Sequence, residues 1–171
     1  MTEQQDINIL DLVAGRTHPT EVVVVALDAQ GLKEARELRD KGQDVPEELV
    51  ERLRKTTVEI TLRGKSSDDI ETISKKWEEG AEKHPDHEFY EDLTVGFLTD
   101  VFFQGIDKIE TLAGEPVSIP DFKTAHEFLS KLSQGERILV MNTVSTLLMQ
   151  SVTYDDNIDA GFLVRAAEET A

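Results

Sequence analysis

Two short segments have strand-like patterns, and together they limit the folds open to this chain. Glu21–Leu27 is a continuous, largely β-branched apolar run, which is typical of a strand. In Thr57–Leu62 apolar and polar residues alternate, which predicts a strand with one buried face. Two strands alone are marginally stable and need helices against their apolar face. We therefore predict an α+β fold in which a small two-stranded sheet packs with helices.

The chain after Gly64 has helical patterns throughout. Ser66 or Ser67 can cap the first helix of this part, because serine side chains accept hydrogen bonds from free N–H groups at a helix start. The Ser133–Glu136 segment has the spacing of a capping box and predicts the start of the last helix. These patterns predict a mostly α-helical fold with a C-terminal helical bundle at residues 66–150.

We predict one globular domain, residues 21–154, between two appendages. Residues 1–20 form a polar arm, and residues 155–171 form an acidic tail. Inside the domain, a charge-rich helical excursion, Ala29–Lys41 and Pro46–Lys55, separates the two strands. The arm contains a small apolar cluster that can dock elsewhere: Ile9, Leu10, Leu12 and Val13.

The charge balance and the residue types exclude several functions. The chain has 35 acidic and 18 basic residues and a net charge of −17, so its surface repels phosphate backbones and direct nucleic-acid binding is not expected. The absence of cysteine excludes disulfides, zinc–cysteine sites and thiol catalysis. The longest apolar run, Val22–Leu27, is far too short to span a membrane. We expect a soluble intracellular protein.

No group of residues in the sequence indicates catalysis or a cofactor. His84 and His87 have the spacing of a metal-binding pair, but no third or fourth ligand is apparent. The Asp155–Asp159 segment imitates the opening of a calcium loop, yet Ala160 and Ala166 stand where glycine and glutamate are required. A phosphate-binding glycine loop and a nucleophile elbow are also absent from the sequence. We expect a protein that is not an enzyme.

Arg63 and Trp77 are candidate contact residues, each with two interpretations. Arg63 ends the alternating strand, where it either pairs with the acidic helix start at Asp68 and Asp69 or contacts a partner. Trp77 is the only tryptophan and lies on the apolar stripe of its helix. It either belongs to the core or forms a binding hot spot.

The most apolar part of the chain is Phe89–Ile109, and three of the seven phenylalanines lie close together in it. Phe97 and Phe102 have helical spacing, whereas Phe103 lies on a different face. A helix that is apolar on more than one side is either buried centrally or presents a face to a partner. In the second case, the expected partner-binding residues are Phe97, Val101, Phe102, Phe103 and Arg63.

The order of these segments matches a known pattern. A strand ends in Leu-Arg within Ile60–Arg63, and a helix that contains Trp77 ends at His84–Pro85. An apolar, aromatic helix follows at Gly96–Ile106, and a helical pair ends in the run Val140–Leu148. This order resembles that of the tail assembly chaperones of long-tailed actinobacterial phages, and the resemblance covers a little over half of the chain.

The resemblance implies a non-enzymatic role without cofactors. Such chaperones coat the long, helical tape measure protein, help to recruit tail tube subunits and leave before the tail is complete. The expected partners are therefore the tape measure protein, the tail tube protein and further copies of this chain. The resemblance also implies that the protein acts in the cytoplasm of the bacterial host and is absent from the mature virion.

Two other functions fit the same sequence. The first is an acidic adaptor or inhibitor that binds a basic host protein, for instance by imitating DNA. It predicts binding that weakens steeply with salt, whereas the chaperone predicts an apolar contact that tolerates salt. The second is a structural head–tail or tail component, which would remain in purified particles.

Overall fold

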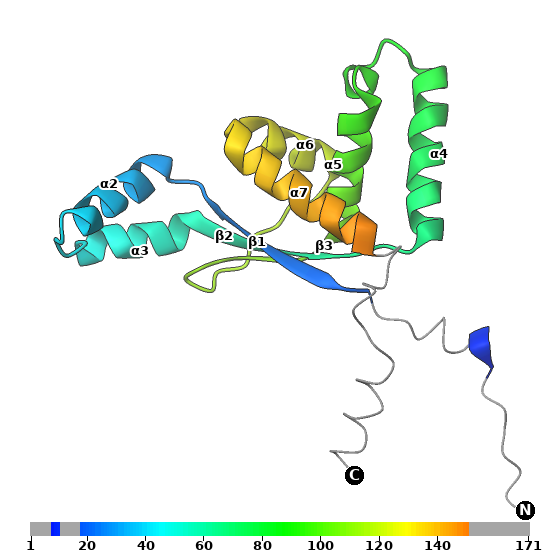
Figure 1. Ribbon diagram of the computed structural model, residues 1–171. Coiled ribbons are helices and arrows are strands. Elements are labelled where there is room, and N and C mark those ends of the chain that lie inside the picture. The colour runs from blue at the N-terminus through cyan, green and yellow to red at the C-terminus, as the bar shows by residue number, and fades with distance from the viewer. Residues whose placement is uncertain (1–7, 11–17, 151–171) are drawn as a thin grey trace, which may run out of the picture.

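The computed structural model describes residues 8–10 and 18–150, and over these residues the fold is α+β, as predicted. A three-stranded antiparallel sheet is combined with six α-helices in this described part (Figure 1). The elements in chain order are β1 (Thr20–Ala26), α2 (Ala29–Asp40), α3 (Glu47–Thr56), β2 (Thr57–Arg63), α4 (Ser67–Lys83), the 3-10 helix η1 (Glu88–Tyr90), α5 (Leu93–Gly105), β3 (Ile106–Thr111), α6 (Phe122–Lys131) and α7 (Gln134–Gln150).

β1 and β2 pair antiparallel along their full length, which confirms the predicted pairing of the two strand-like segments. Val23 lies opposite Ile60, and Val25 lies opposite Val58. These four side chains and Leu62 are buried against the helices. The predicted apolar face of the second strand is therefore the inner face of the sheet.

The prediction of a two-stranded sheet is wrong, because Ile106–Thr111 forms a third strand, β3. It pairs antiparallel with β2 on the side opposite to β1. Ile106 and Ile109 are three residues apart, a spacing that suits a helix and so concealed the strand. The second edge of β2 offers backbone groups that need partners, and Ile109 becomes buried when β3 supplies them.

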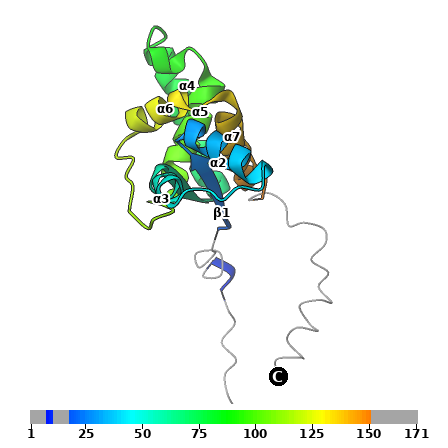
Figure 2. The same cartoon turned by 90° about the vertical axis from the view of Figure 1, so that its left-hand side faces the viewer.

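Helices α4 to α7 lie over one face of the sheet, and no helix of the described residues covers the opposite face (Figure 1). α5 is central, because it contacts α4, α6, α7 and β2. α4 and α5 form an antiparallel pair that stands away from the sheet, whereas α7 contacts β1. α2 and α3 form a hairpin beyond one end of the sheet (Figure 2). The predicted C-terminal bundle at residues 66–150 is thus matched only roughly, because β3 interrupts it.

Polar caps determine where two of these helices start. The Ser66 side chain accepts a hydrogen bond from the backbone N–H of Asp69, and the Asp69 carboxylate accepts one from the backbone N–H of Ser66. The predicted capping box of α7 is also present, since the backbone N–H of Ser133 donates to Glu136 at 2.8 Å. Each box satisfies N–H groups that the first helical turn leaves without partners.

The predicted appendages lie mainly outside the described residues. Of the apolar cluster predicted in the arm, Ile9 and Leu10 are exposed, and its other two members lie outside the described residues. The predicted acidic tail, residues 155–171, also lies outside them. β1 starts at Thr20, so the sheet begins at the last residue of the predicted arm, residues 1–20.

Candidate partner-binding surface

The most apolar helix of the sequence, α5, has its second half in the core. Asp92 caps its first turn, so the helix begins at Leu93 and not near Gly96 as predicted. Phe102 is 0% exposed, and Val101 is also buried. For this half of α5, the structure favours the buried interpretation over an open face.

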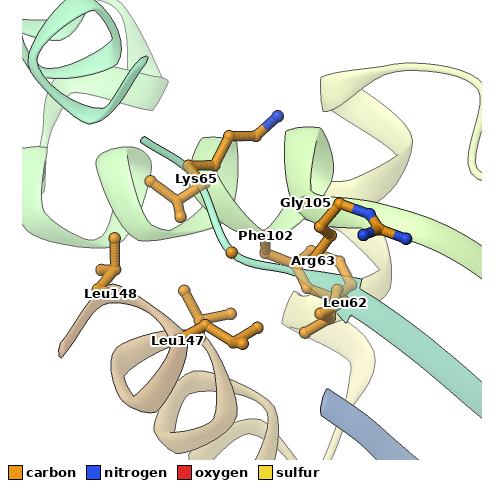
Figure 3. Close-up of a pocket in the computed structure, with 10 residues that line it drawn as sticks. Leu62, Arg63, Lys65, Phe102, Gly105, Leu147 and Leu148 are labelled. Atoms are coloured by element: carbon orange, nitrogen blue, oxygen red, sulfur yellow. The ribbon is translucent and has the colours of Figure 1, made fainter. Parts of the chain in front are cut away.

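Three of the predicted binding residues, Arg63, Val101 and Phe102, line one hollow between the end of β2, α5 and α7 (Figure 3). The hollow measures about 240 Å³, including the part open to solvent. Leu147 and Leu148 of α7 form its opposite wall. The charged end of Arg63 points away from these leucines (Figure 3). The hollow is therefore apolar, and its floor belongs to the protein core.

Arg63 pairs with Asp107 of β3, and not with Asp68 or Asp69 as one interpretation predicted. Its Nη2 and Nε donate to the Asp107 carboxylate at 2.8 and 3.3 Å, whereas Asp69 caps α4. The hydrogen bond from Arg63 lowers the pKa of Asp107, and it raises the pKa of Arg63 itself. Both side chains are close to half exposed, so Arg63 stays accessible to a partner.

Phe97 and Phe103 are partly buried against the core, on different sides of α5. Six residues rotate an α-helix by about 240°, so the two rings cannot share a face. Phe97 lines a hollow next to α4 that Phe103 does not reach. The structure therefore does not bring the predicted phenylalanines together as one contact surface.

Two open hollows flank the first half of α5. The α4–α5 hollow measures about 470 Å³ including its open mouth, and its lining residues are Ser74, Trp77, Glu78, Leu93, Thr94 and Phe97. The α5–α7 hollow, which also borders α6, measures about 520 Å³ in the same way. Its lining residues are Val95, Leu98, Thr99, His126, Leu129, Ser130, Arg137 and Met141.

The sequence patterns did not indicate two exposed apolar side chains that line these hollows, Leu93 and Val95. Leu93 is 41% exposed and Val95 is 50% exposed. Leu93 and Phe97 are four residues apart, and Val95 and Leu98 are three apart, so each pair lies on one side of the helix. One signal in the sequence could have indicated these residues. Apolar residues at helical spacing begin directly after Asp92, but the predicted helix began only near Gly96.

Charged side chains of both signs border the two hollows. Glu78 borders the α4–α5 hollow, and Arg137 borders the α5–α7 hollow. Arg137 donates to the backbone carbonyls of Leu129 and Ser130 at 3.0 and 3.1 Å, which satisfies carbonyl groups at the end of α6. The hollows can therefore accept apolar side chains, with charged groups available at their rims.

Trp77 belongs to the core, as one of its two interpretations predicted. It is buried, and its ring lies 5.2 Å from that of Tyr90 and 5.3 Å from that of Phe122, measured between centroids. Trp77 nevertheless lines the α4–α5 hollow. Trp77 is therefore a rigid wall for anything that binds there.

Within residues 8–10 and 18–150, no group of three or more histidine, cysteine, aspartate or glutamate side chains could hold a metal ion. His87 instead caps η1, accepting a hydrogen bond on Nδ1 from the backbone N–H of Phe89 at 3.2 Å. No helix in the same part of the chain is long and apolar enough to cross a membrane.

Comparisons with protein-family models, curated proteins and solved structures find no match. The function is therefore inferred from the residues themselves.

Proposed function

We propose that this protein is a non-enzymatic phage tail assembly chaperone that binds the tape measure protein through the two hollows beside α5. One observation carries the proposal: α5 exposes Leu93 and Val95 at two hollows whose linings are half apolar, in a chain with a net charge of −17. Amphipathic helices bind by placing apolar side chains in grooves of this kind. The segment order from Ile60–Arg63 to Val140–Leu148, which resembles that of such chaperones, supports the same function.

In this proposal, apolar residues of a partner helix enter the α4–α5 hollow against Leu93 and the α5–α7 hollow against Val95. Phe97 forms a wall of the α4–α5 hollow, while Val101 and Phe102 hold α5 in place from the core. Each contact is small, so many copies bound along one long partner supply the strength. The acidic exterior keeps such a complex soluble in the host cytoplasm, and tail tube subunits are the second proposed partner.

Co-purification of a co-expressed tape measure protein tests the proposal. We expect the double variant Leu93→Glu/Val95→Glu to fold normally, because both side chains are exposed, and to lose the tape measure protein. The matched control is Val50→Glu/Leu112→Glu, which adds the same charge at side chains of similar exposure, 42% and 41%, away from α5. We expect the control to retain the tape measure protein. If Leu93→Glu/Val95→Glu captures as much tape measure protein as the control does, the hollows are not the contact.

Two further measurements separate the proposal from its alternatives. Apolar contacts persist when the salt concentration is raised, whereas a complex between an acidic adaptor and a basic partner dissociates because salt screens exposed charges. A chaperone is absent from purified virions, whereas a structural head–tail or tail component is present in them. We expect salt-tolerant binding and absence from the particle.

A further inference from the structure

The outer edge of β1 has backbone hydrogen-bonding groups that no described residue uses. The backbone N–H of Leu27 donates to the carbonyl of Thr56, and that of Gly64 donates to the carbonyl of Pro19, both at 2.9 Å. In an antiparallel pair these bonds fall on alternate residues, so the odd-numbered residues of β1 face β2. The residues whose N–H and C=O groups point to the free edge are Thr20, Val22, Val24 and Ala26.

The other edge of the sheet, formed by β3, is covered by the segment that follows it, whereas the edge of β1 is open. The backbone N–H of Val117 donates to the carbonyl of Ile109 at 2.9 Å, and that of Thr111 donates to the carbonyl of Glu115 at 2.8 Å. β3 also has a register irregularity against β2. Sheets commonly protect their edges by bulges, covering segments, prolines or charged residues. β1 has a regular register over its whole length and neither a proline nor a lysine.

The side chains along the open edge are apolar. Val22 is 55% exposed and Val24 is 45% exposed, on the face of the sheet that no described helix covers (Figure 1). The residues from Val22 to Leu27 are uncharged in a chain of which 31% is charged. An open, regular and uncharged edge is a template for another strand.

We propose that a second copy of this chain occupies the edge, through antiparallel pairing of β1 with β1 of that copy about a two-fold axis at Val23. This register places Val22 opposite Val24 of the second copy and Thr20 opposite Ala26, all with outward backbone groups. The four resulting pairs exchange two hydrogen bonds each, about eight in total. The two sheets become one continuous sheet. This inference does not depend on the proposed function.

The strand sequence fits a copy of itself without a charge conflict. In this register Glu21 stands opposite Val25 of the second copy, so the two Glu21 residues are about 13 Å apart along the strands and largely screened. Val22 and Val24 of both copies form one apolar cluster on the open face. On β2, Glu59 and Thr61 lie beside this cluster and give it a polar border, as in protein interfaces generally.

The oligomeric state of the full chain in analytical ultracentrifugation tests the proposal. We expect a dimer for the natural sequence and a monomer for Val24→Lys and Val24→Pro. The Pro variant removes an outward N–H group that β1–β2 pairing does not use, and it also fixes the φ angle at this position. The control is Val50→Lys, which places the same charge at a valine of similar exposure in α3, 42% against 45%, outside the sheet, and should remain dimeric. Far-UV circular dichroism reports whether each variant folds. If the Pro variant does not fold, the oligomeric state of Val24→Lys alone tests the proposal.

The register is tested with single cysteines, because the chain contains none. An oxidised equal mixture of Val22→Cys and Val24→Cys should cross-link several-fold more than either variant alone, since these positions face each other only between copies. A monomeric natural chain, or a dimer that Val24→Lys leaves intact, would overturn the inference. Neither result would affect the proposed binding of the tape measure protein, which lies beside α5.

Discussion

The indole Nε1 of Trp77 donates a hydrogen bond to the buried carboxylate of Asp100 at 2.8 Å. Lys76 Nζ lies 3.0 Å from the same oxygen, and Gln104 Nε2 donates to the other oxygen at 3.0 Å. Asp100 is 1% exposed, so these partners replace the water that its carboxylate loses. The network joins α4 to α5 and holds the walls of the α4–α5 hollow together.

Replacing Asp100 should loosen this joint. We expect Asp100→Ala to lower the free energy of unfolding by roughly 3 kcal/mol, because it removes charge-assisted hydrogen bonds and leaves the Trp77 N–H buried without an acceptor. Urea denaturation measures the change. Asp86→Ala, at an exposed residue in the turn after α4, is the control and should have almost no effect. Equal stabilities of the two variants would show that the network is not needed.

Gly96 should not tolerate a side chain. A Cβ atom there would lie 2.5 Å from Cζ3 of Trp77, so Gly96→Ala must displace the indole ring or α4. We expect a loss of about 1–3 kcal/mol and a changed fluorescence spectrum, since Trp77 is the only tryptophan. The control is Gly135→Ala in α7, where a Cβ atom meets nothing within 4 Å. This variant should be neutral or slightly more stable.

Phe102 should act as a core residue and not as a contact residue. It is fully buried, and its ring stacks on that of Phe128 with centroids 6.4 Å apart. We expect Phe102→Ala to cost about 3–5 kcal/mol of stability, while Leu93→Ala, at a partly exposed residue, costs little. Thermal unfolding compares the two variants. A Phe102→Ala protein with normal stability that no longer binds the tape measure protein would contradict this assignment.

Carboxylate caps should make stability depend on pH. Hydrogen bonds from the side chain and the backbone N–H of Thr124 lower the pKa of Asp121, and a hydrogen bond from the side chain of Ser66 lowers that of Asp69. A pKa that is lower in the folded state adds stability above the unfolded value, about 4 for aspartate, and this stability is lost as pH falls through the folded pKa. We expect the stability advantage over Asp121→Asn to be constant above about pH 5 and to shrink below pH 4.

Urea midpoints of the natural chain and of Asp121→Asn, measured from pH 2 to pH 7, check this dependence. The difference between the two proteins cancels the general effect of neutralising the acidic surface, which both share. A difference that stays constant down to pH 2 would show that the Asp121 carboxylate does not stabilise the fold through its charge.

Local signals in the sequence predicted most individual elements. The β-branched run, the alternating strand that ends at Arg63 and the capping box at Ser133 all depend on neighbours within a few residues. The α+β class and the pairing of β1 with β2 followed from these signals. β3 was missed because Ile106 and Ile109 also suit a helix, and the start of α5 was missed because Asp92 was not recognised as a cap.

The candidate surface was only partly predictable, because exposure is a property of the packed molecule. The phenylalanines indicated α5 as the candidate helix. In the folded protein Phe102 is buried in the core, whereas Leu93 and Val95 are exposed. Arg63 pairs with Asp107, which is distant in the sequence and becomes adjacent only when β3 pairs with β2.

Local patterns in the sequence were enough for most element types, with β3 as the exception, and for the main caps, the acidic surface and the absence of cysteine chemistry. These depend on backbone preferences, on contacts between near neighbours and on composition. Tertiary packing determines which face of α5 is open, which partner Arg63 takes and which edge of the sheet has no partner among the described residues. Those outcomes depend on which residues far apart in the chain pack against each other and form hydrogen bonds. Patterns within a few neighbouring residues do not contain that information.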